Sequence, residues 1–180
     1  LKEQGELKDN MVVSTVMSNI GFYKAIEENG LQSVKTAVGD RYVVEEMRKN
    51  DYSLGGEQSG HIVLMNYATT GDGILTAVKL ANIIKTSGKS LEELASEVNI
   101  YPQKLVNIKV VDKKTAMEDA EILAECEKVE KELEGNGRIL LRASGTENLI
   151  RVMVEASSDE LTDKYCEQVA KIVREKFEVK

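Results

Sequence analysis

The segment 137–155 constrains the fold more than any other part of this 180-residue chain. An apolar run at 139–141 leads into the small residues of 143–146. Beyond this turn the side chains alternate with a period of two, which is the pattern of a strand with two different faces. One face carries Ile150, Val152 and Val154, and the other carries Arg151, Met153 and Glu155. The sequence therefore predicts two strands joined by a short turn.

The turn between these strands has the chemistry of an anion site. Gly145 permits a backbone shape in which successive N–H groups converge, and Ser144 and Thr146 add hydroxyl donors. Arg142 and Arg151 flank the turn, and guanidinium groups form forked hydrogen bonds that match phosphate oxygens. An ordinary hairpin with two solvated arginines fits the same residues. The residues alone leave both interpretations open.

Composition narrows the class of protein. The chain is 42% hydrophobic but only 4% aromatic and has no Trp, which is typical of an aliphatic α/β core. Its formal net charge of −7 argues against nucleic-acid binding, so an anionic ligand would need a local cluster of arginines. The sequence contains no signal peptide and no apolar run of bilayer length. We therefore expect a cytoplasmic protein that does not bind membranes.

The cysteines and the single histidine do not indicate a metal centre. Cys126 and Cys166 fall in helix-like stretches at core-facing spacing, and we expect buried free thiols, while a bridge between them stays an alternative. His61 has no Cys/His cluster around it, so we expect no zinc site.

Residues 1–100 are expected to form a mixed α/β domain. Strand and helix patterns alternate along them, as in the β-α-β units of a largely parallel sheet. Asp40 is expected to cap a helix over 42–49, and Asp72 a helix from 74 to about 85. The chain opens without Met on a segment that looks like a helix end. We therefore expect a piece of a longer protein, beginning with a short remnant of the preceding domain.

Residues 101–180 are expected to form a second, smaller domain. The only proline, Pro102, stands between the helical patterns before it and a new strand, and we place the boundary at 99–104. The order that follows is strand, helix, strand, strand, helix, with the first helix over 115–134. This order predicts an α+β domain with both helices on one face of an antiparallel sheet.

A second polar segment, Gly-Gly-Glu-Gln-Ser-Gly-His at 55–61, precedes an apolar strand. A carboxylate such as Glu57 and a hydroxyl such as Ser59, held on a glycine-supported loop, are groups that bind sugar hydroxyls. A plain polar loop before an edge strand, with His61 packed or solvated, is the alternative. The residues alone do not decide between the two.

Together the two segments resemble a known family. Gly-Gly-Glu-Gln-Ser-Gly-His, followed at 142–155 by Arg-Ala-Ser-Gly-Thr-Glu-Asn-Leu-Ile-Arg-Val-Met-Val-Glu, is similar to the α-D-phosphohexomutases. The phrases at 38–43 and 70–74 favour the bacterial members that act on glucosamine phosphates over the phosphomannomutase members. The resemblance covers essentially the whole chain, in order.

The resemblance implies the third and fourth of four domains around a cleft, and it assigns roles to individual residues. The residues implied to contact the sugar are Glu57 and Ser59, with His61 and the turn Gly39, Asp40 and Arg41 nearby. The residues implied to bind phosphate are Arg142, Ser144, Gly145 and Thr146, with Arg151 beside them. Family members often have proline where Asn148 stands. Because Asn is itself compatible with a turn, we expect binding to be kept.

Family members transfer a phosphoryl group from a phosphoserine to the sugar and back from the other end of a bisphosphate. Their serine lies in a Ser-His-Asn loop and their Mg²⁺ in an Asp-Gly-Asp-x-Asp loop, and neither motif occurs here. We therefore expect no catalytic residue and no Mg²⁺ ligand in this chain, which would bind and position but not catalyse.

The resemblance thus implies a whole protein that interconverts glucosamine 6-phosphate and glucosamine 1-phosphate with Mg²⁺. Its partners would be the hexosamine phosphate and the missing N-terminal domains. The alternatives are a phosphomannomutase or phosphoglucomutase, and a non-catalytic phosphosugar-binding module.

Overall fold

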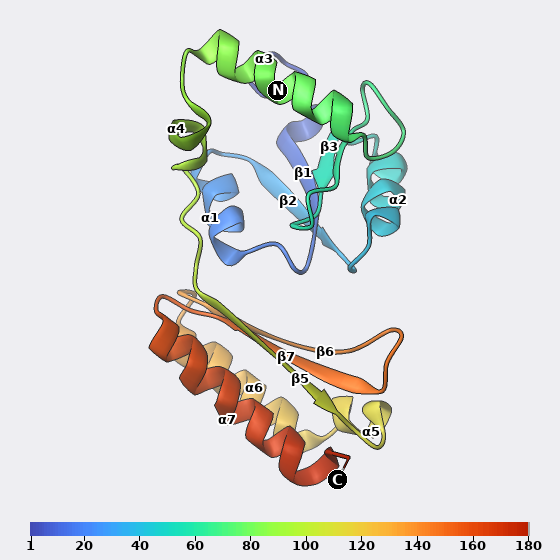
Figure 1. Ribbon diagram of the computed structural model, residues 1–180, viewed down its shortest axis with the longest axis vertical. Helices are drawn as coiled ribbons and strands as arrows, with labels where there is room; N and C mark the ends of the chain where they lie inside the picture. Colours follow the sequence, from blue (N-terminus) through green and yellow to red (C-terminus); the bar gives the residue numbers. More distant parts are fainter. Residues whose placement is uncertain (180) are drawn as a thin grey trace. The chain divides into compact units, whose positions relative to one another are not determined.

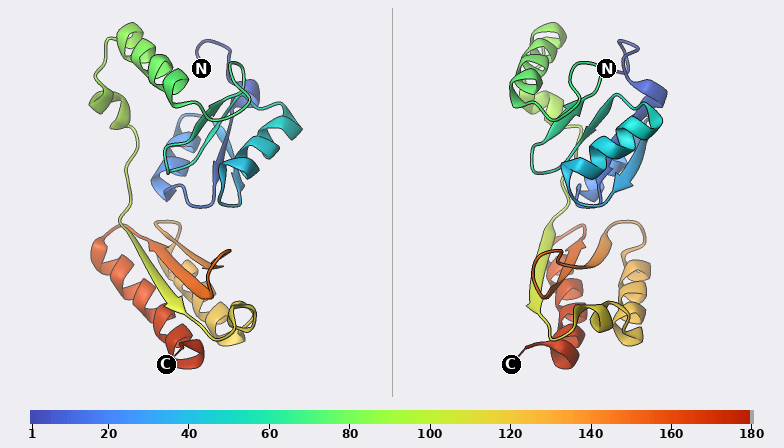
Figure 2. Two further views of the ribbon diagram at one scale, coloured as in Figure 1. Left: turned by 45° about the vertical axis from the view of Figure 1, so that its right-hand side comes forward. Right: turned by 90° about the vertical axis from the view of Figure 1, so that its right-hand side faces the viewer.

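The computed structural model describes residues 1–179, which divide into two compact units (Figure 1). Unit 1 comprises Leu1–Ile100 and unit 2 comprises Tyr101–Lys180. Each unit has its own sheet and its own hydrophobic core, and the same two sheets are visible in the rotated views of Figure 2.

Unit 1 contains a four-stranded sheet in the order β2-β1-β3-β4. Strand β1 is parallel to β2 and β3, whereas β3 and β4 are antiparallel. This mixed sheet with its helices confirms the predicted fold class. The elements in chain order are the 3₁₀ helix η1 (Lys8–Asn10), β1 (Met11–Thr15), α1 (Ile20–Glu28), β2 (Gln32–Thr36), α2 (Asp40–Asn50), β3 (Leu54–Gly56), β4 (Ile62–Leu64), α3 (Gly73–Ser87) and α4 (Leu91–Ala95).

Helix α2 covers one face of this sheet. Val43 and Met47, one helical turn apart, are completely buried against Val13 of β1 and Val63 of β4. Gly55 of β3 makes this close packing possible, because a Cβ there would lie 2.5 Å from Met47 Sδ. The first glycine of the predicted sugar segment therefore serves the core of unit 1.

Two helix starts in unit 1 follow the signals in the sequence. Asp72 caps α3, since its carboxylate accepts the N–H of Leu75 at 2.9 Å. Ser90 and Glu93 form a reciprocal capping box at the start of α4.

The prediction that Asp40 caps α2 was wrong. The N-cap is Gly39, with φ 131°, a conformation that glycine adopts without strain. Helix α2 therefore starts one or two residues earlier than expected, and Asp40 is its first residue. The Asp40 carboxylate accepts only the adjacent N–H of Arg41, at 2.8 Å, and makes no capping bond.

Unit 2 contains a three-stranded antiparallel sheet in the order β5-β7-β6. Helices α6 and α7 lie side by side across one face of it (Figure 1), which confirms the predicted α+β arrangement. The elements are β5 (Gln103–Lys109), α5 (Lys113–Met117), α6 (Ala120–Leu133), β6 (Arg138–Ala143), β7 (Leu149–Glu155) and α7 (Asp159–Phe177).

The two faces of the central strand β7 have different roles. Its alternate residues Ile150, Val152 and Val154 are buried in the core under the helices. On the opposite face Glu155 is also fully buried, and Arg138 binds it through two nitrogens at 2.7 and 3.2 Å. This second face therefore carries charged side chains on either side of the buried Met153.

The single helix predicted over 115–134 was wrong, because the structure has two. Helix α5 ends at Met117, and Asp119 then caps α6 by accepting the N–H groups of Glu121 and Ile122, each at 3.1 Å. The capping carboxylate satisfies the free N–H groups of a new helix. The helix is therefore interrupted at a point where the apolar pattern alone predicts that it continues.

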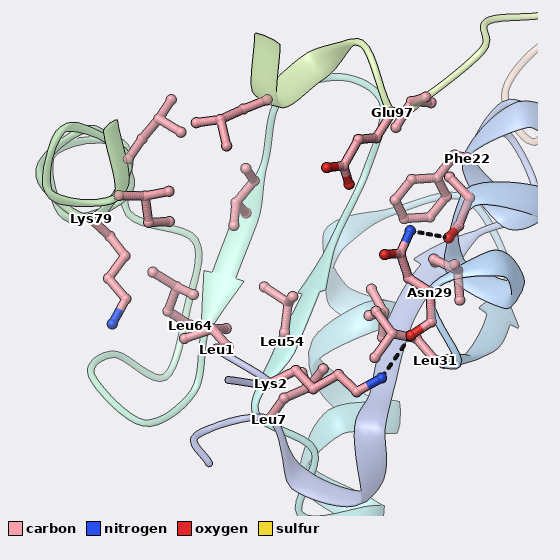
Figure 3. Close-up of a pocket in the computed structure, with 18 of the residues that line it drawn as sticks. Leu1, Lys2, Leu7, Phe22, Asn29, Leu31, Leu54, Leu64, Lys79 and Glu97 are labelled. Carbon is pink, nitrogen blue, oxygen red and sulfur yellow. Dashed lines mark hydrogen bonds between the residues drawn. The ribbon is translucent and has the colours of Figure 1, made fainter. Parts of the chain in front are cut away.

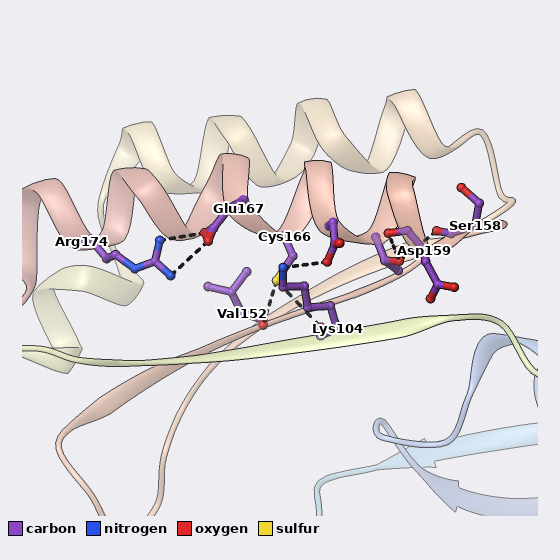
Figure 4. Close-up of polar contacts among 9 residues, drawn as sticks. Lys104, Val152, Ser158, Asp159, Cys166, Glu167 and Arg174 are labelled. Carbon is purple, nitrogen blue, oxygen red and sulfur yellow. Dashed lines mark hydrogen bonds and ion pairs between the residues drawn. The ribbon is translucent and has the colours of Figure 1, made fainter.

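Helix α7 is held to the sheet by packing and by polar contacts (Figure 4). Cys166 is buried with its Sγ 3.5 Å from the carbonyl oxygen of Val152, and Arg174 pairs with Glu167 along the helix at 2.7 Å. Both cysteines are free thiols as expected, but only Cys166 is buried and Cys126 is half-buried. Burial raises the pKa of both thiols to about 11, so both stay protonated at neutral pH.

Candidate functional site

Arg142 and Arg151 are direct cross-strand partners near the turn between β6 and β7. Directly opposite residues of an antiparallel pair project from the same face, here the face away from α6 and α7. The Nε atoms of both arginines are shielded from solvent and have no hydrogen-bond partner among residues 1–179. Arg151 makes one long ion pair, 3.9 Å, with the exposed Glu147. The structure thus holds two guanidinium groups together and leaves the Nε atom of each without a hydrogen-bond partner among the described residues.

This pair is electrostatically unfavourable unless an anion is present. Burial lowers the pKa of Arg142 from its ordinary value, and the charge of Arg151 lowers it further. An arginine nevertheless stays protonated, so two positive charges face each other. Like charges directly opposite each other destabilise a sheet. The oxygens of a phosphate dianion would accept hydrogen bonds from the free Nε–H groups. Its negative charge would offset the repulsion between the two arginines.

The turn beside this pair presents free donors. Ser144 is buried, and its hydroxyl oxygen accepts the N–H of Glu147 at 3.3 Å, which leaves the hydroxyl hydrogen available. Gly145 and Thr146 are exposed, and their N–H groups have no partner in the described part of the chain. Gly145 is not among the glycines with a positive φ. Open space surrounds the position of its Cβ, so the missing side chain leaves its N–H accessible.

Two residues that the sequence analysis did not single out as functional anchor this turn. Lys113 Nζ donates to the carbonyl oxygens of Ser144 at 2.9 Å and Glu147 at 3.4 Å. The Asn148 side chain donates to the carbonyl oxygens of residues 110 and 111, at 2.8 and 3.1 Å. These contacts join residues that are 31 to 38 positions apart in the sequence, so no local sequence pattern predicts them.

In unit 1 the structure brings the two predicted sugar segments together through Glu57. One carboxylate oxygen accepts the N–H of Gly39 at 2.9 Å, and the other lies 3.9 Å from His61 Nδ1. Ser59 Oγ lies 3.0 Å from the same His61 nitrogen. The Glu57 side chain is only 9% exposed, so it connects the 39–41 turn to the 57–61 loop from within. Ser59 and His61 are exposed on the outside of this loop.

Arg41 and Asp40 do not converge on that loop by any bond. Arg41 is 74% exposed and pairs with Glu45 on its own helix at 3.1 Å. The structure thus gathers Gly39, Glu57, Ser59 and His61 into one contact network, with Asp40 and Arg41 at its edge. The predicted sugar loop belongs to unit 1 and the predicted phosphate turn to unit 2.

Unit 1 also contains an apolar groove of about 830 Å³ (Figure 3). One helical stripe from α1 and one from α3 form its walls, and the sheet forms its floor. None of the six predicted sugar-binding residues lines this groove. The residues that define it are Phe22, Ala25, Ile26, Leu80, Ile83, Leu54 and Leu64. Its apolar lining does not match the polar surface of a phosphorylated sugar.

Residues 1–179 contain no group of three or more His, Cys, Asp or Glu side chains that could hold a metal ion. These residues therefore do not fit a magnesium site. In the same part of the chain, no helix is both long and apolar enough to cross a bilayer.

Two family models match the chain. Residues 1–101 match the model described as phosphoglucomutase/phosphomannomutase, alpha/beta/alpha domain III. Residues 105–172 match the model described as the phosphoglucomutase/phosphomannomutase C-terminal domain.

Curated relatives match almost the whole of this chain but only part of their own length. The phosphoglucosamine mutase of Anoxybacillus flavithermus is 61% identical over 177 residues, which cover 98% of this chain and 40% of that protein. The phosphoglucosamine mutase of Leuconostoc mesenteroides is 61% identical over 176 residues, covering 98% and 39%. The chain therefore spans about 40% of the length of these relatives.

A solved structure shares the fold. It is N-acetylphosphoglucosamine mutase of Aspergillus fumigatus, described in complex with GlcNAc-6P and magnesium. The TM-score is 0.77 at 22% identity, over 92% of this chain and 38% of that one.

Proposed function

Because the chain belongs to the phosphoglucomutase/phosphomannomutase family, we propose that the protein containing it is a phosphoglucosamine mutase. The reaction is the interconversion of glucosamine 6-phosphate and glucosamine 1-phosphate. The curated relatives at 61% identity bear that enzyme's name, which supports this choice of substrate within the family. In this proposal residues 1–100 supply a sugar-binding loop and residues 101–180 supply a phosphate-binding turn.

The Arg142–Arg151 pair is the observation that carries the proposal. Two neighbouring guanidinium groups whose shielded Nε atoms have no hydrogen-bond partner among residues 1–179, beside the free N–H groups of Gly145 and Thr146, match the charge and the acceptors of a phosphate. Ser144 adds a hydroxyl. The phosphate bound here is the one that is not reacting, so this turn anchors the substrate in either of its two orientations.

The loop in unit 1 supplies the sugar contacts. Ser59 and His61 are exposed, while Glu57 keeps carboxylate lone pairs beyond the one bond to Gly39. A carboxylate, a hydroxyl and an imidazole together accept from and donate to sugar hydroxyls. Because the sugar must bind in two orientations, contacts from a short glycine-flanked loop suit it better than a rigid slot.

This chain positions the substrate, and the reacting groups lie elsewhere in the protein. Phosphoryl transfer depends mainly on positioning and on stabilising charge, so residues distant from the reacting atoms contribute to the rate. Magnesium, named in the complex of the Aspergillus fumigatus enzyme, would be held by other residues of the protein, since residues 1–179 offer no cluster for it. A cytoplasmic location is part of this proposal.

The test is to measure mutase activity of the whole protein and of Arg142→Ala with glucosamine 6-phosphate. Hydrogen bonds to charged groups contribute about 1.5–3 kcal/mol, so kcat/KM should fall roughly tenfold to a hundredfold. Phosphorylation of the catalytic serine, measured by mass spectrometry, should stay close to that of the unmodified protein.

Three results would contradict the proposal in different ways. An equal loss of serine phosphorylation would remove the positioning role of Arg142. Higher activity with mannose or glucose phosphates would assign the protein to another member of the family. Binding of phosphosugars without any mutase activity would indicate a non-catalytic binding module.

A further inference from the structure

We propose that Lys113 is a positioning residue for the phosphate turn, because it orients two peptide groups of the turn, one of which carries the N–H of Gly145 that would bind the anion. This inference rests on the proposed phosphate site. It assigns a role to a lysine that lies outside the turn in sequence and would not itself contact the phosphate.

The starting observation is that one ammonium group binds two carbonyl oxygens of the same turn. Lys113 Nζ lies 2.9 Å from the oxygen of Ser144 and 3.4 Å from the oxygen of Glu147. These carbonyls belong to the first and last peptide groups of the segment 144–148. A single cation thus pulls both ends of the turn toward the same side.

Because peptide groups are planar, these two hydrogen bonds also fix the directions of the neighbouring N–H groups. In a planar trans peptide the C=O and the following N–H point in opposite directions. The C=O of Ser144 faces Lys113, so the N–H of Gly145 faces away from it, and the same holds for Glu147 and Asn148. Neither N–H has a partner in the described part of the chain. Lys113 therefore occupies the acceptor side of the turn and leaves its donor side to an anion.

Asn148 holds the turn to the same piece of chain by a second set of bonds. Its side-chain amide donates to the carbonyl oxygens of Val110 and Val111. Its backbone carbonyl oxygen accepts the N–H of Val110 at 3.1 Å. Residues 110–113 are therefore joined to the turn by both backbone and side-chain hydrogen bonds. The amide of Asn148 fixes where the turn lies, and the ammonium of Lys113 fixes which way its peptides face.

The neighbouring Lys114 provides a matched control. It carries the same charge on the same short helix but is exposed, and its side chain makes no bond to the turn. A substitution there removes an equal charge from the same region. Any difference between the two lysines therefore reports the contact with the turn rather than the general electrostatic field.

The experiment compares the 180-residue chain with Lys113→Met, Lys113→Arg and Lys114→Met by amide NMR. Without ligand, residual dipolar couplings report the N–H directions of Gly145 and Asn148. Each variant is then titrated with inorganic phosphate and with glucosamine 6-phosphate. The amide spectrum outside 143–149 checks that each variant is folded.

Lys113→Met should change both couplings and weaken phosphate binding roughly tenfold, since about one hydrogen bond to a charged group is lost. Lys113→Arg should restore most of the affinity, and Lys114→Met should change it less than about twofold. Because the effect works through orientation, the deficit of Lys113→Met should persist at about 0.5 M salt, where surface charge effects are screened.

Equal behaviour of Lys113→Met and Lys114→Met would overturn the inference. If the unmodified chain binds neither probe, the phosphate site itself is wrong. The couplings of Gly145 in the free chain then still decide whether Lys113 orients the turn, so the two failures can be told apart.

Discussion

Arg142 and Arg151 face each other across the β6–β7 ladder, and neither Nε atom has a hydrogen-bond partner among the described residues. Four residue pairs away on the same strands, Arg138 and Glu155 form a buried ion pair with two hydrogen bonds. Arginine is thus paired with a carboxylate at one end of the β6–β7 ladder, whereas at the other end two arginines have Nε atoms without a hydrogen-bond partner among the described residues. We place the phosphate at the end with Arg142 and Arg151.

The contrast predicts opposite effects of one substitution at the two positions. Arg142→Met keeps an apolar stem and removes a like-charge contact, so without anion it should stabilise the chain by about 0.2–1 kcal/mol. Arg138→Met leaves the carboxylate of Glu155 buried and unpaired, and should destabilise it by about 3–5 kcal/mol. Urea unfolding measures both. Destabilisation by Arg142→Met comparable to that of Arg138→Met would show that Arg142 is a structural residue.

Substitution of Glu57 should separate the structural and binding roles of this side chain. Glu57→Ala leaves the N–H of Gly39 without its acceptor, which should cost about 1–3 kcal/mol of stability. Glu57→Gln keeps an oxygen acceptor for Gly39, so unfolding should change much less, while the loss of charge still weakens sugar binding. Equal destabilisation by Ala and Gln would contradict the contact with Gly39.

Two glycines of unit 1 should respond oppositely to alanine. A Cβ at Gly55 would lie 2.7 Å from Val43 Cγ1 and 3.1 Å from the carbonyl oxygen of Val13, so Gly55→Ala should destabilise by about 1–3 kcal/mol. Gly73 lies at the start of α3 with nothing within 4 Å of its Cβ position. Gly73→Ala should therefore be neutral or stabilise by up to about 1 kcal/mol. Thermal unfolding of both variants tests the packing of β3 on α2.

Acid should weaken the contact that Asp119 makes with α7. The hydrogen bond and charge of Lys176 hold the pKa of this carboxyl below its ordinary value of 3.8. A lowered native pKa means that the contribution to stability is complete above about pH 4 and is lost as the pH falls through the lowered value. Asp119→Asn should therefore show a shallower loss of stability below pH 4, measured by urea unfolding at several pH values. An unchanged slope would refute this coupling.

Local signals in the sequence predicted the parts of the fold that local interactions determine. Asp72 caps its helix as predicted, Ser90 and Ser158 also cap helices, and the alternation after residue 149 separated the two faces of β7 correctly. The break before α6 was missed because the apolar pattern continues across it, while the competing cap at Asp119 is a single residue.

The remaining features depend on contacts between distant residues. Strand β3 contains two glycines in three residues and has no strand pattern, and it forms because β1 and β4 pair with it on either side. In the candidate site, the sequence predicted the turn at 144–146 with both arginines beside it, and their role in binding phosphate stays a prediction. It gave no sign of Lys113, because a bond from a lysine to a backbone carbonyl 31 residues away places no requirement on the neighbouring sequence.

The most direct test of the phosphate site is a backbone-amide NMR titration of this chain with glucosamine 6-phosphate, with inorganic phosphate as the second ligand. Saturable shifts at Gly145 and Thr146 with both ligands, and at Glu57 or Ser59 with the sugar phosphate alone, are the predicted result. Arg142→Met should abolish the shifts at the turn while leaving the rest of the spectrum in place. Absence of saturable shifts at Gly145 and Thr146 with either ligand would contradict the account.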